Sequence, residues 1–194
     1  VADFPSIDSD AGDVELTLDQ AVLRKLLDQV SFSMAQQDVR YFLNGMLLEV
    51  SPDNTRTVAT DGHRLAMCTH GEGNEGRGLT HAIIPRKGVI ELSRLLDEKD
   101  EKVSIRLGSN HLTVSRDGYE LTTKLVDGKF PEYDKVIPRD SSRSMVADRE
   151  TLRQSCQRAS ILSNEKYRGV RLMLDNDQLT IQANNPEQEE AEEV

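Results

Sequence analysis

The sequence predicts an α+β fold in which helices cover one face of antiparallel sheet, and two observations support this prediction. The chain of 194 residues contains similar segments in the same order at offsets of 123 to 126 positions. Each copy reads as an amphipathic helix followed by short strands with turn residues between them. A fixed offset between similar segments indicates one structural unit used twice. We therefore expect one complete unit and a partial second copy.

The first unit is expected to open on a helix from Leu18 to Val30, in which Val22, Leu23, Leu26, Leu27 and Val30 share one face. Thr17-x-x-Gln20 before it has the pattern of a capping box. A polar bend at 35–38 then precedes strands through 45–48, 57–61 and 64–68. Asp61-Gly62 between the last two strands is a common hairpin signal.

The same unit continues through a glycine-rich loop at 71–78 into a strand at 82–84. A helix is expected over 85–97, with Pro85 in its first turn, where a missing backbone N–H costs nothing. Strands follow near 102–107, 111–115 and 119–126. The first copy is therefore expected to contain two helices, each followed by strands.

The second copy begins where Phe130-Pro131 repeats Phe4-Pro5. Its helix is expected over 148–162, with Asp148 as N-cap and Leu152, Cys156 and Ala159 as the apolar stripe. A bend at 163–166 and strands at 169–172 and 180–184 follow. The acidic end at 187–193 resembles a solvated tail, yet its place in the repeat predicts another strand. We expect the chain to be a fragment, which its start at Val rather than Met also suggests.

Composition narrows the class of protein. Hydrophobic residues make up 37% and charged residues 30%, a globular balance. The sequence has neither a membrane-spanning apolar run nor a signal peptide, so we expect a cytoplasmic protein. Cys68 and Cys156 form no CxxC pair and are expected to be reduced structural thiols. The net charge of −10 argues against a uniformly basic nucleic-acid binder but leaves room for a local basic surface.

The predicted helices concentrate basic residues on their outer faces. Together they carry eight basic and six acidic side chains, whereas the rest of the chain is strongly acidic. Arg24 and Lys25 lie opposite the leucine stripe, Lys87 and Arg94 share a face, and Arg149 and Arg153 are one turn apart. Such faces can hold a polyanion through phosphate contacts without reading its sequence. Charge alone, however, favours ordinary solvated helices.

Other patterns suggest weaker alternatives. Asp61, His63 and Arg64 are residue types used in acid–base chemistry, which leaves open a small-molecule enzyme, although a hairpin explains them equally well. The four histidines lack metal-ligand spacing, so neither a metal nor another cofactor is expected. An apolar surface for a partner peptide is conceivable at Leu43, Leu65, Pro131 and Val136, but the same residues also suit a core.

Several longer motifs resemble one family, the bacterial replicative sliding clamp, which is the beta subunit of DNA polymerase III. The resemblance covers nearly the whole chain, and only 69–80 diverges. The motifs are Asp38–Met46, Thr57–Leu65, Pro85–Leu92, Lys124–Gly128 with Phe130-Pro131, Leu162–Lys166 and Ala183–Glu189.

The resemblance implies a DNA-clamp fold, whose domains each have two β-α-β-β-β halves with helices on one face of a curved antiparallel sheet. Three such domains form a subunit, and a homodimer forms a ring around duplex DNA. On that map residues 1–12 are an inter-domain linker and 13–129 the middle domain, while 130–194 are a linker and the N-terminal half of the third domain. The implied protein is no enzyme. It tethers the polymerase catalytic subunit, and the clamp loader and other partners bind it through short peptides.

The resemblance also assigns residues to two surfaces. Those that match family positions facing DNA are Arg24, Lys25, Gln37, Arg86 and Lys87, and the basic helix faces described above add Arg94, Arg149 and Arg153. Those expected to line the partner-peptide pocket are Leu43, Thr60, Gly62, His63, Arg64, Leu65, Pro131, Lys135 and Val136. The rest of that pocket belongs to strands beyond this chain, so half a pocket is expected to bind peptides poorly. A peptide-binding scaffold that does not encircle DNA remains a further alternative.

Overall fold

The computed structural model describes residues 14–71, 78–97, 101–161, 169–175, 177–185 and 189–193. The chain divides into two compact units, residues 1–136 (unit 1) and 137–194 (unit 2). The predicted linker at 1–12, most of the glycine-rich loop and the bend at 163–166 lie outside the described residues.

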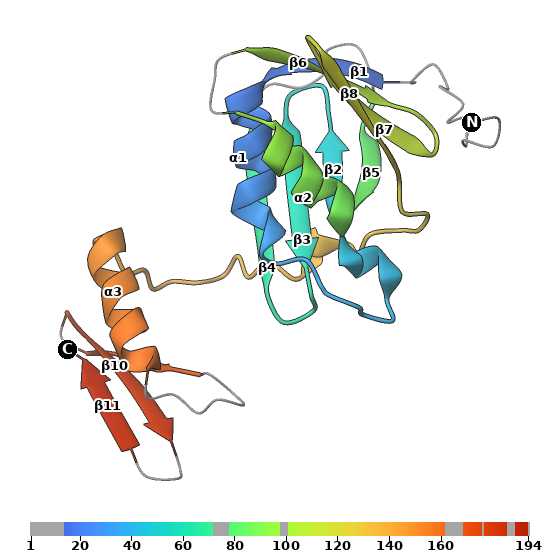
Figure 1. Cartoon of the computed structure of the whole chain (residues 1–194). Helices are drawn as coiled ribbons and strands as arrows, with labels where there is room; N and C mark the ends of the chain where they lie inside the picture. Colours follow the sequence, from blue (N-terminus) through green and yellow to red (C-terminus); the bar gives the residue numbers. More distant parts are fainter. Residues whose placement is uncertain are drawn as a thin grey trace. The chain divides into compact units, whose positions relative to one another are not determined.

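Unit 1 consists of two halves with the same β-α-β-β-β order (Figure 1). The first comprises β1 (Val14–Asp19), α1 (Gln20–Ser31), β2 (Gly45–Val50), β3 (Thr55–Thr60) and β4 (Leu65–His70), with a short 3-10 helix η1 (Tyr41–Asn44) before β2. The second comprises β5 (Thr80–Pro85), α2 (Arg86–Leu95), β6 (Lys102–Leu107), β7 (His111–Arg116) and β8 (Tyr119–Lys124).

The strands of unit 1 form two four-stranded sheets, ordered β4-β3-β2-β5 and β1-β6-β7-β8, with every pairing antiparallel. Each sheet takes three strands from one half and the first strand from the other. Neither half therefore completes a sheet alone, and the two halves share both sheets of unit 1. The predicted α+β class with antiparallel sheets is confirmed.

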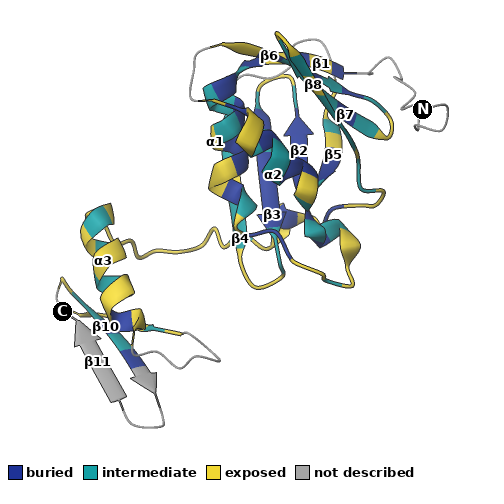
Figure 2. Ribbon diagram, viewed as in Figure 1, coloured by how far each residue is buried: buried dark blue, intermediate teal, exposed yellow. Residues whose placement is uncertain are grey.

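One hydrophobic core joins both sheets and both helices (Figure 2). The expected stripe of α1 is buried at Leu23, Leu26, Leu27 and Val30, and β1 alternates buried Val14, Leu16 and Leu18 with exposed residues. Residues at i, i+3, i+4 and i+7 share one helical face, so this pattern directs α1 onto the sheet. The opposite faces of α1 and α2 point away from this core.

The predicted capping box of α1 is wrong. Thr17 lies within β1, the helix starts at Gln20, and its N-cap Asp19 makes no side-chain cap bond. Instead the Gln20 N–H donates to the Glu101 carbonyl at 2.9 Å, and the buried Gln20 amide donates to the Glu101 carboxylate at 3.1 Å. A residue 81 positions away thus satisfies the helix start, which a local pattern cannot reveal.

Unit 2 repeats the second part of a half as α3 (Arg149–Ser160), β9 (Arg171–Asp175), β10 (Gln178–Asn185) and β11 (Glu189–Glu193). Asp148 is its N-cap as predicted, accepting from the Thr151 N–H at 2.8 Å. The strand expected at the acidic end is confirmed as β11, which pairs with β10. The predicted stripe also holds, because buried Ala159 packs with Ile181 and Ala183 while Leu152 and Cys156 flank them.

Candidate functional site

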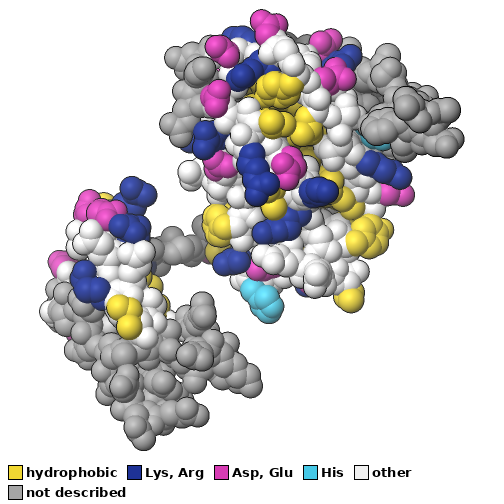
Figure 3. All heavy atoms as spheres, viewed as in Figure 1, with side chains coloured by type: hydrophobic (Ala, Val, Ile, Leu, Met, Phe, Trp, Pro, Cys, Tyr) yellow, Lys and Arg dark blue, Asp and Glu magenta, His cyan; other side chains and the backbone are white. Residues whose placement is uncertain are grey.

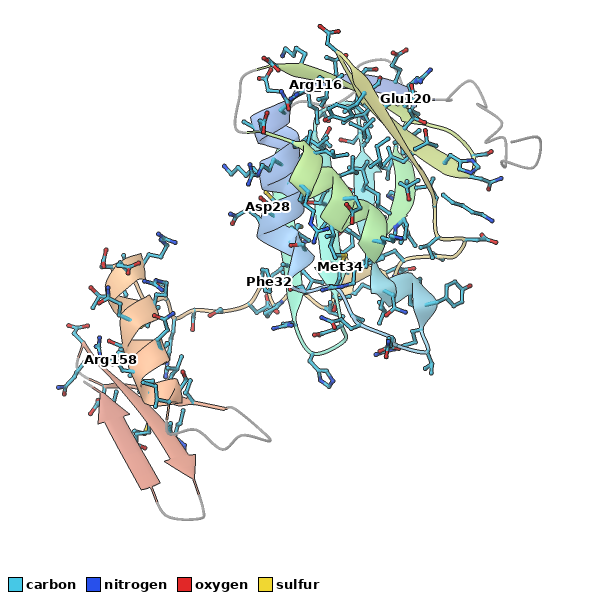
Figure 4. All side chains as sticks on the ribbon, in the orientation of Figure 1. Asp28, Phe32, Met34, Arg116, Glu120 and Arg158 are labelled. Carbon is cyan, nitrogen blue, oxygen red and sulfur yellow. The ribbon has the colours of Figure 1, made fainter. Side chains whose placement is uncertain are left out.

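The outer face of α1 and α2 is the first candidate surface. The two helices pack side by side on the β4-β3-β2-β5 sheet, and Figure 3 shows Lys and Arg side chains gathered over them with a few acidic ones. Arg24 Nη1 donates to the Leu96 carbonyl just beyond α2 at 3.3 Å, which links the start of α1 to the end of α2. Arg24 also pairs with Asp28, which projects from the outer side of α1 (Figure 4). Lys25 is exposed and has no ion pair within the described residues.

The first turn of α2 is unusually cationic. It begins with Arg86 and Lys87 and contains no acidic residue, although the positive end of a helix dipole disfavours cations. Neither side chain forms an ion pair within the part of the chain that the structure describes, and Lys87 is exposed. Two unpaired cations beside free helix N–H groups create a local positive potential suited to an anion. At the other end Arg94, 70% exposed, pairs with Glu91.

The remaining residues predicted to face DNA lie elsewhere. Gln37 is exposed in the bend after α1 with a left-handed backbone, φ 57°. Arg149 and Arg153 lie exposed on α3 of unit 2, where Arg158 also projects outward (Figure 4). Arg153 pairs with Glu150, which partly neutralises that helix. The expectation for unit 2 is therefore weaker than that for unit 1.

The turn between β3 and β4 gathers four of the residues predicted for the peptide pocket. Thr60 Oγ1 donates to the Arg64 carbonyl at 2.7 Å and accepts from the Gly62 N–H at 3.0 Å. The Asp61 carboxylate accepts from the N–H groups of His63 and Arg64, and these backbone hydrogen bonds, led by that of His63, lower the pKa of Asp61. A carboxylate engaged in this way caps a turn and is a poor general base, which disfavours the enzyme reading.

Arg64 and Arg40 fix this turn to its surroundings. Arg64 Nη2 donates to the Phe32 carbonyl at 3.0 Å, and its guanidinium lies 5.6 Å from the Phe32 ring centroid. Arg40 donates to the Asp61 carbonyl, and a Cβ at Gly62 would come within 3.1 Å of the Arg40 guanidinium. Gly62 also has φ +88°, so glycine is required here. The turn is consequently a rigid surface feature.

The other predicted pocket residues have different positions. Leu43 is buried, with 2% exposure, whereas Leu65 is half-buried at the start of β4. Pro131, Lys135 and Val136 are exposed on residues 125–136, a segment that we call the strap. Pro131 and Lys135 line a cavity of about 770 Å³ between the strap and the sheet, to which neither Leu43 nor the β3–β4 turn contributes.

The strap lies against a row of polar side chains that the sequence reasoning did not single out. On β2 and β3, Glu49 and Arg56 are directly opposite each other, and Arg56 Nη1 lies 3.3 Å from Glu49 Oε1. The strap hydroxyl of Tyr133 accepts from Arg56 at 2.9 Å and donates to Glu49 at 3.1 Å. Burial raises the pKa of Tyr133, which keeps this hydroxyl protonated. The available signal was a single charged residue in each strand, Glu49 in β2 and Arg56 in β3.

Among the described residues, no group of three or more His, Cys, Asp and Glu side chains is arranged to hold a metal ion. None of the described helices is long and apolar enough to span a membrane.

A domain of duplicated β-α-β-β-β halves with cationic helices on one face defines the DNA-clamp class. The family model for the DNA polymerase III beta subunit, central domain, matches residues 17–132, and the model for its C-terminal domain matches residues 134–194. The chain belongs to the DNA polymerase III beta subunit family.

Individual relatives agree with this assignment. The chain is 53% identical over 191 residues to the beta sliding clamp of Pseudomonas aeruginosa, covering 98% of this chain and 52% of that protein. It is 50% identical over 193 residues to the Escherichia coli K12 beta sliding clamp, again covering 52% of it. The crystal structure of the P. aeruginosa subunit superposes with a TM-score of 0.95 over 99% of this chain and 53% of that one. The chain thus spans about half the length of these relatives.

Proposed function

We propose that this chain forms the middle domain and part of the third domain of a DNA sliding clamp. The whole protein would act as a ring-shaped homodimer in the bacterial cytoplasm, encircling duplex DNA and tethering the replicative polymerase. The clamp loader and other partners would bind the same protein through short peptides. Its role is topological and not catalytic.

The observation that carries this proposal is the contrast between the helices of unit 1 and the rest of the chain. The outer faces of α1 and α2 present Lys25, Arg86 and Lys87 without ion-pair partners in the described residues, on a chain of net charge −10. A ring that slides needs phosphate contacts that are few, weak and independent of sequence. An acidic exterior would repel DNA everywhere except along the helices.

The partner-peptide pocket is proposed at the β3–β4 turn, η1 and the strap of unit 1. Two relatives of this chain, the clamps of P. aeruginosa and Bartonella birtlesii, have crystal structures bound to griselimycin. With 53% and 36% identity to these proteins, we expect the whole protein that carries this chain to bind griselimycin as well. The rigid turn at 60–64 supplies a preformed wall, which reduces the entropic cost of binding.

Retention on DNA tests the encircling role. The whole protein, loaded onto nicked circular DNA by its clamp loader, should stay bound through a high-salt wash and dissociate once the DNA is linearised. High salt removes phosphate contacts, so only topology can then hold the protein. Equal loss from circular and linear DNA would favour the non-encircling scaffold instead.

A second arm of the experiment tests the helix face directly. Binding of the whole protein to a short duplex, measured at several salt concentrations, should weaken in the double variant Lys25→Ala/Lys87→Ala. Its salt slope should fall by about 1.8, because each phosphate contact contributes about 0.9. The control variant Lys129→Ala removes one positive charge from the strap, where Lys129 neighbours Glu132, and should leave the slope unchanged. A slope unaffected by the double variant would exclude α1 and α2 as the DNA-facing surface.

A further inference from the structure

The β4-β3-β2-β5 sheet carries ordered rows of side chains on the face away from the helices. Cross-strand register places His81, Glu49, Arg56 and Thr69 side by side, followed by Ile83, Leu47, Val58 and Met67. Thr60 lies on the same face of β3 as Arg56, because residues four apart in a strand point the same way. The strand that carries Arg56 therefore ends at the proposed peptide pocket.

The first row is a continuous chain of hydrogen bonds. His81 Nε2 lies 3.1 Å from Glu49 Oε2, Arg56 Nη1 donates to Glu49 Oε1, and Arg56 Nε donates to Thr69 Oγ1 at 3.0 Å. Glu49 is only 9% exposed, so its charge needs these partners. The Tyr133 hydroxyl joins this row by accepting from Arg56 and donating to Glu49. All four strands thereby contribute to one anchor for the strap.

The strap is also held at its start, where the Leu125 N–H donates to the Asn110 carbonyl at 2.7 Å and Leu125 packs against the core. At its start the Val126 N–H donates to the Ile83 carbonyl of β5 at 2.9 Å, and Phe130 is buried farther on. Between strap and sheet lies the cavity of about 770 Å³, lined by Leu47, Glu49 and Ile83 on the sheet side. At the strap's second end the Tyr133 side chain is buried, with 6% exposure. The two hydrogen bonds of its hydroxyl fix this end of the strap to β2 and β3.

The position of Tyr133 is transmitted to the proposed pocket through one helical turn. Tyr133–Lys135 form the 3-10 helix η2, in which the Val136 N–H donates to the Tyr133 carbonyl at 3.1 Å. Lys135 and Val136, two of the predicted pocket residues, are thus fixed relative to the backbone of Tyr133. Pro131 precedes the ring by two positions on the same strap. Movement of Tyr133 would carry all three residues with it.

We propose that Tyr133, through its hydroxyl bonds to Glu49 and Arg56, is the positioning residue of the partner-peptide pocket. It makes no contact with the peptide itself. It holds the strap wall in register with the wall at the β3–β4 turn, so that partners do not have to order the strap when they bind. This inference rests on the proposed pocket.

Griselimycin is a suitable probe, and calorimetric titration into the whole protein measures its affinity. Tyr133→Phe keeps the ring and removes the hydroxyl, and should weaken binding about three- to tenfold, the cost of ordering one or two side chains. Tyr119→Phe is the matched control, because it removes a hydroxyl that bonds the Leu95 carbonyl elsewhere in unit 1. It should leave griselimycin affinity unchanged.

Substitutions at Glu49 separate positioning from a general loss of stability. Glu49→Gln retains an oxygen that accepts from Tyr133 and should rescue most of the affinity that Glu49→Ala loses. The double variant Glu49→Ala/Tyr133→Phe should bind no more weakly than the worse single variant, because both remove one tie. If Glu49→Ala fails to fold, the comparison of Tyr133→Phe with Tyr119→Phe still tests the positioning role of Tyr133.

The results distinguish the two proposals. Wild-type protein that does not bind griselimycin would overturn the proposed pocket together with this inference. Wild-type binding with equal affinity in Tyr133→Phe would overturn the positioning role alone. Equal losses in Tyr133→Phe and Tyr119→Phe would also overturn it, because the effect would then report stability and not the strap.

Discussion

Asp38 organises the segment between α1 and η1 through its own short-range hydrogen bonds. Its Oδ1 accepts from the Arg40 N–H at 2.8 Å and its Oδ2 accepts from Arg40 Nη2 at 2.8 Å, while Asn44 bonds both backbone groups of Asp38. The Arg40 side chain is the largest cause that lowers the Asp38 pKa from 3.8 to about 2. Asp38 thus orients the guanidinium that approaches Gly62 in the proposed pocket.

This pKa predicts how Asp38 contributes to stability as pH changes. Because the pKa is lower in the folded protein, the contribution is complete above the ordinary value of 3.8 and is lost as pH falls toward 2. An NMR titration of the Asp38 carboxyl carbon should show a midpoint near pH 2, and Arg40→Gln should raise it toward 3.8. A wild-type midpoint near 3.8 would show that the pair does not persist in solution.

Single residues differ in how well their environment can be predicted from the sequence. Asp61 and Gly62 were predictable as a hairpin, because both partners of the Asp61 carboxylate lie within three positions. The Glu49–Arg56–Tyr133 group was not predictable, because it requires the register of two strands and a residue 77 positions beyond Arg56. Hydrogen bonds between residues close in sequence can be predicted from the sequence, whereas cross-strand partners are known only once the strand register is known.

At the scale of elements, Gly88 shows how closely α2 approaches β8. A Cβ at Gly88 would lie 2.9 Å from Thr123 Oγ1 and 3.2 Å from Thr123 Cγ2. Alanine in a helix gains about 1 kcal/mol over glycine, whereas overpacking costs about 1–3 kcal/mol. Gly88→Ala should therefore lower the free energy of unfolding by about 1 kcal/mol, as measured by urea denaturation.

Shortening the Thr123 side chain should abolish or reverse the loss of stability that Gly88→Ala causes. In a Thr123→Ala background the same Gly88→Ala change should be neutral or stabilising by up to about 1 kcal/mol, since the helix propensity remains and the clash is gone. Thr123→Ala alone provides the reference. An equal loss in both backgrounds would mean that the close approach to Thr123 is not what requires glycine.

The elements themselves were predicted where an apolar face was periodic. The apolar stripes predicted for α1 and α3 matched the structure, since periodicity reports which face meets the core, whereas β1 was not predicted from its residues. Helix starts were less consistent, because Asp148 caps α3 with its own side chain while distant Glu101 completes the start of α1. The proposed pocket residues and five of the eight DNA-facing residues came from family motifs, the other three came from the helix faces, and all remain predictions.

At the scale of the whole molecule, the two units have very different cores. Unit 1 buries apolar residues from all eight strands except β4 and β8, whose apolar residues only flank the core, together with both helices. In the described part of unit 2, the core is limited to Ala159, Ile181 and Ala183, and β9 leaves Leu172 54% and Leu174 55% exposed. Buried apolar area is the main source of folding stability, so the units should differ in stability.

Hydrogen exchange measured across a urea series should resolve this difference in the 194-residue chain. Amides of α3 and β10 in unit 2 should lose protection at lower urea than those of β2 and β3, because units with separate cores open separately. Ala159→Gly should advance exchange in unit 2 and leave β2 and β3 unchanged. Ala59→Gly in the core of unit 1 should do the reverse. A single shared transition for all four elements would mean that the units fold cooperatively, in which case the repeat would mark a common architecture without independent stability.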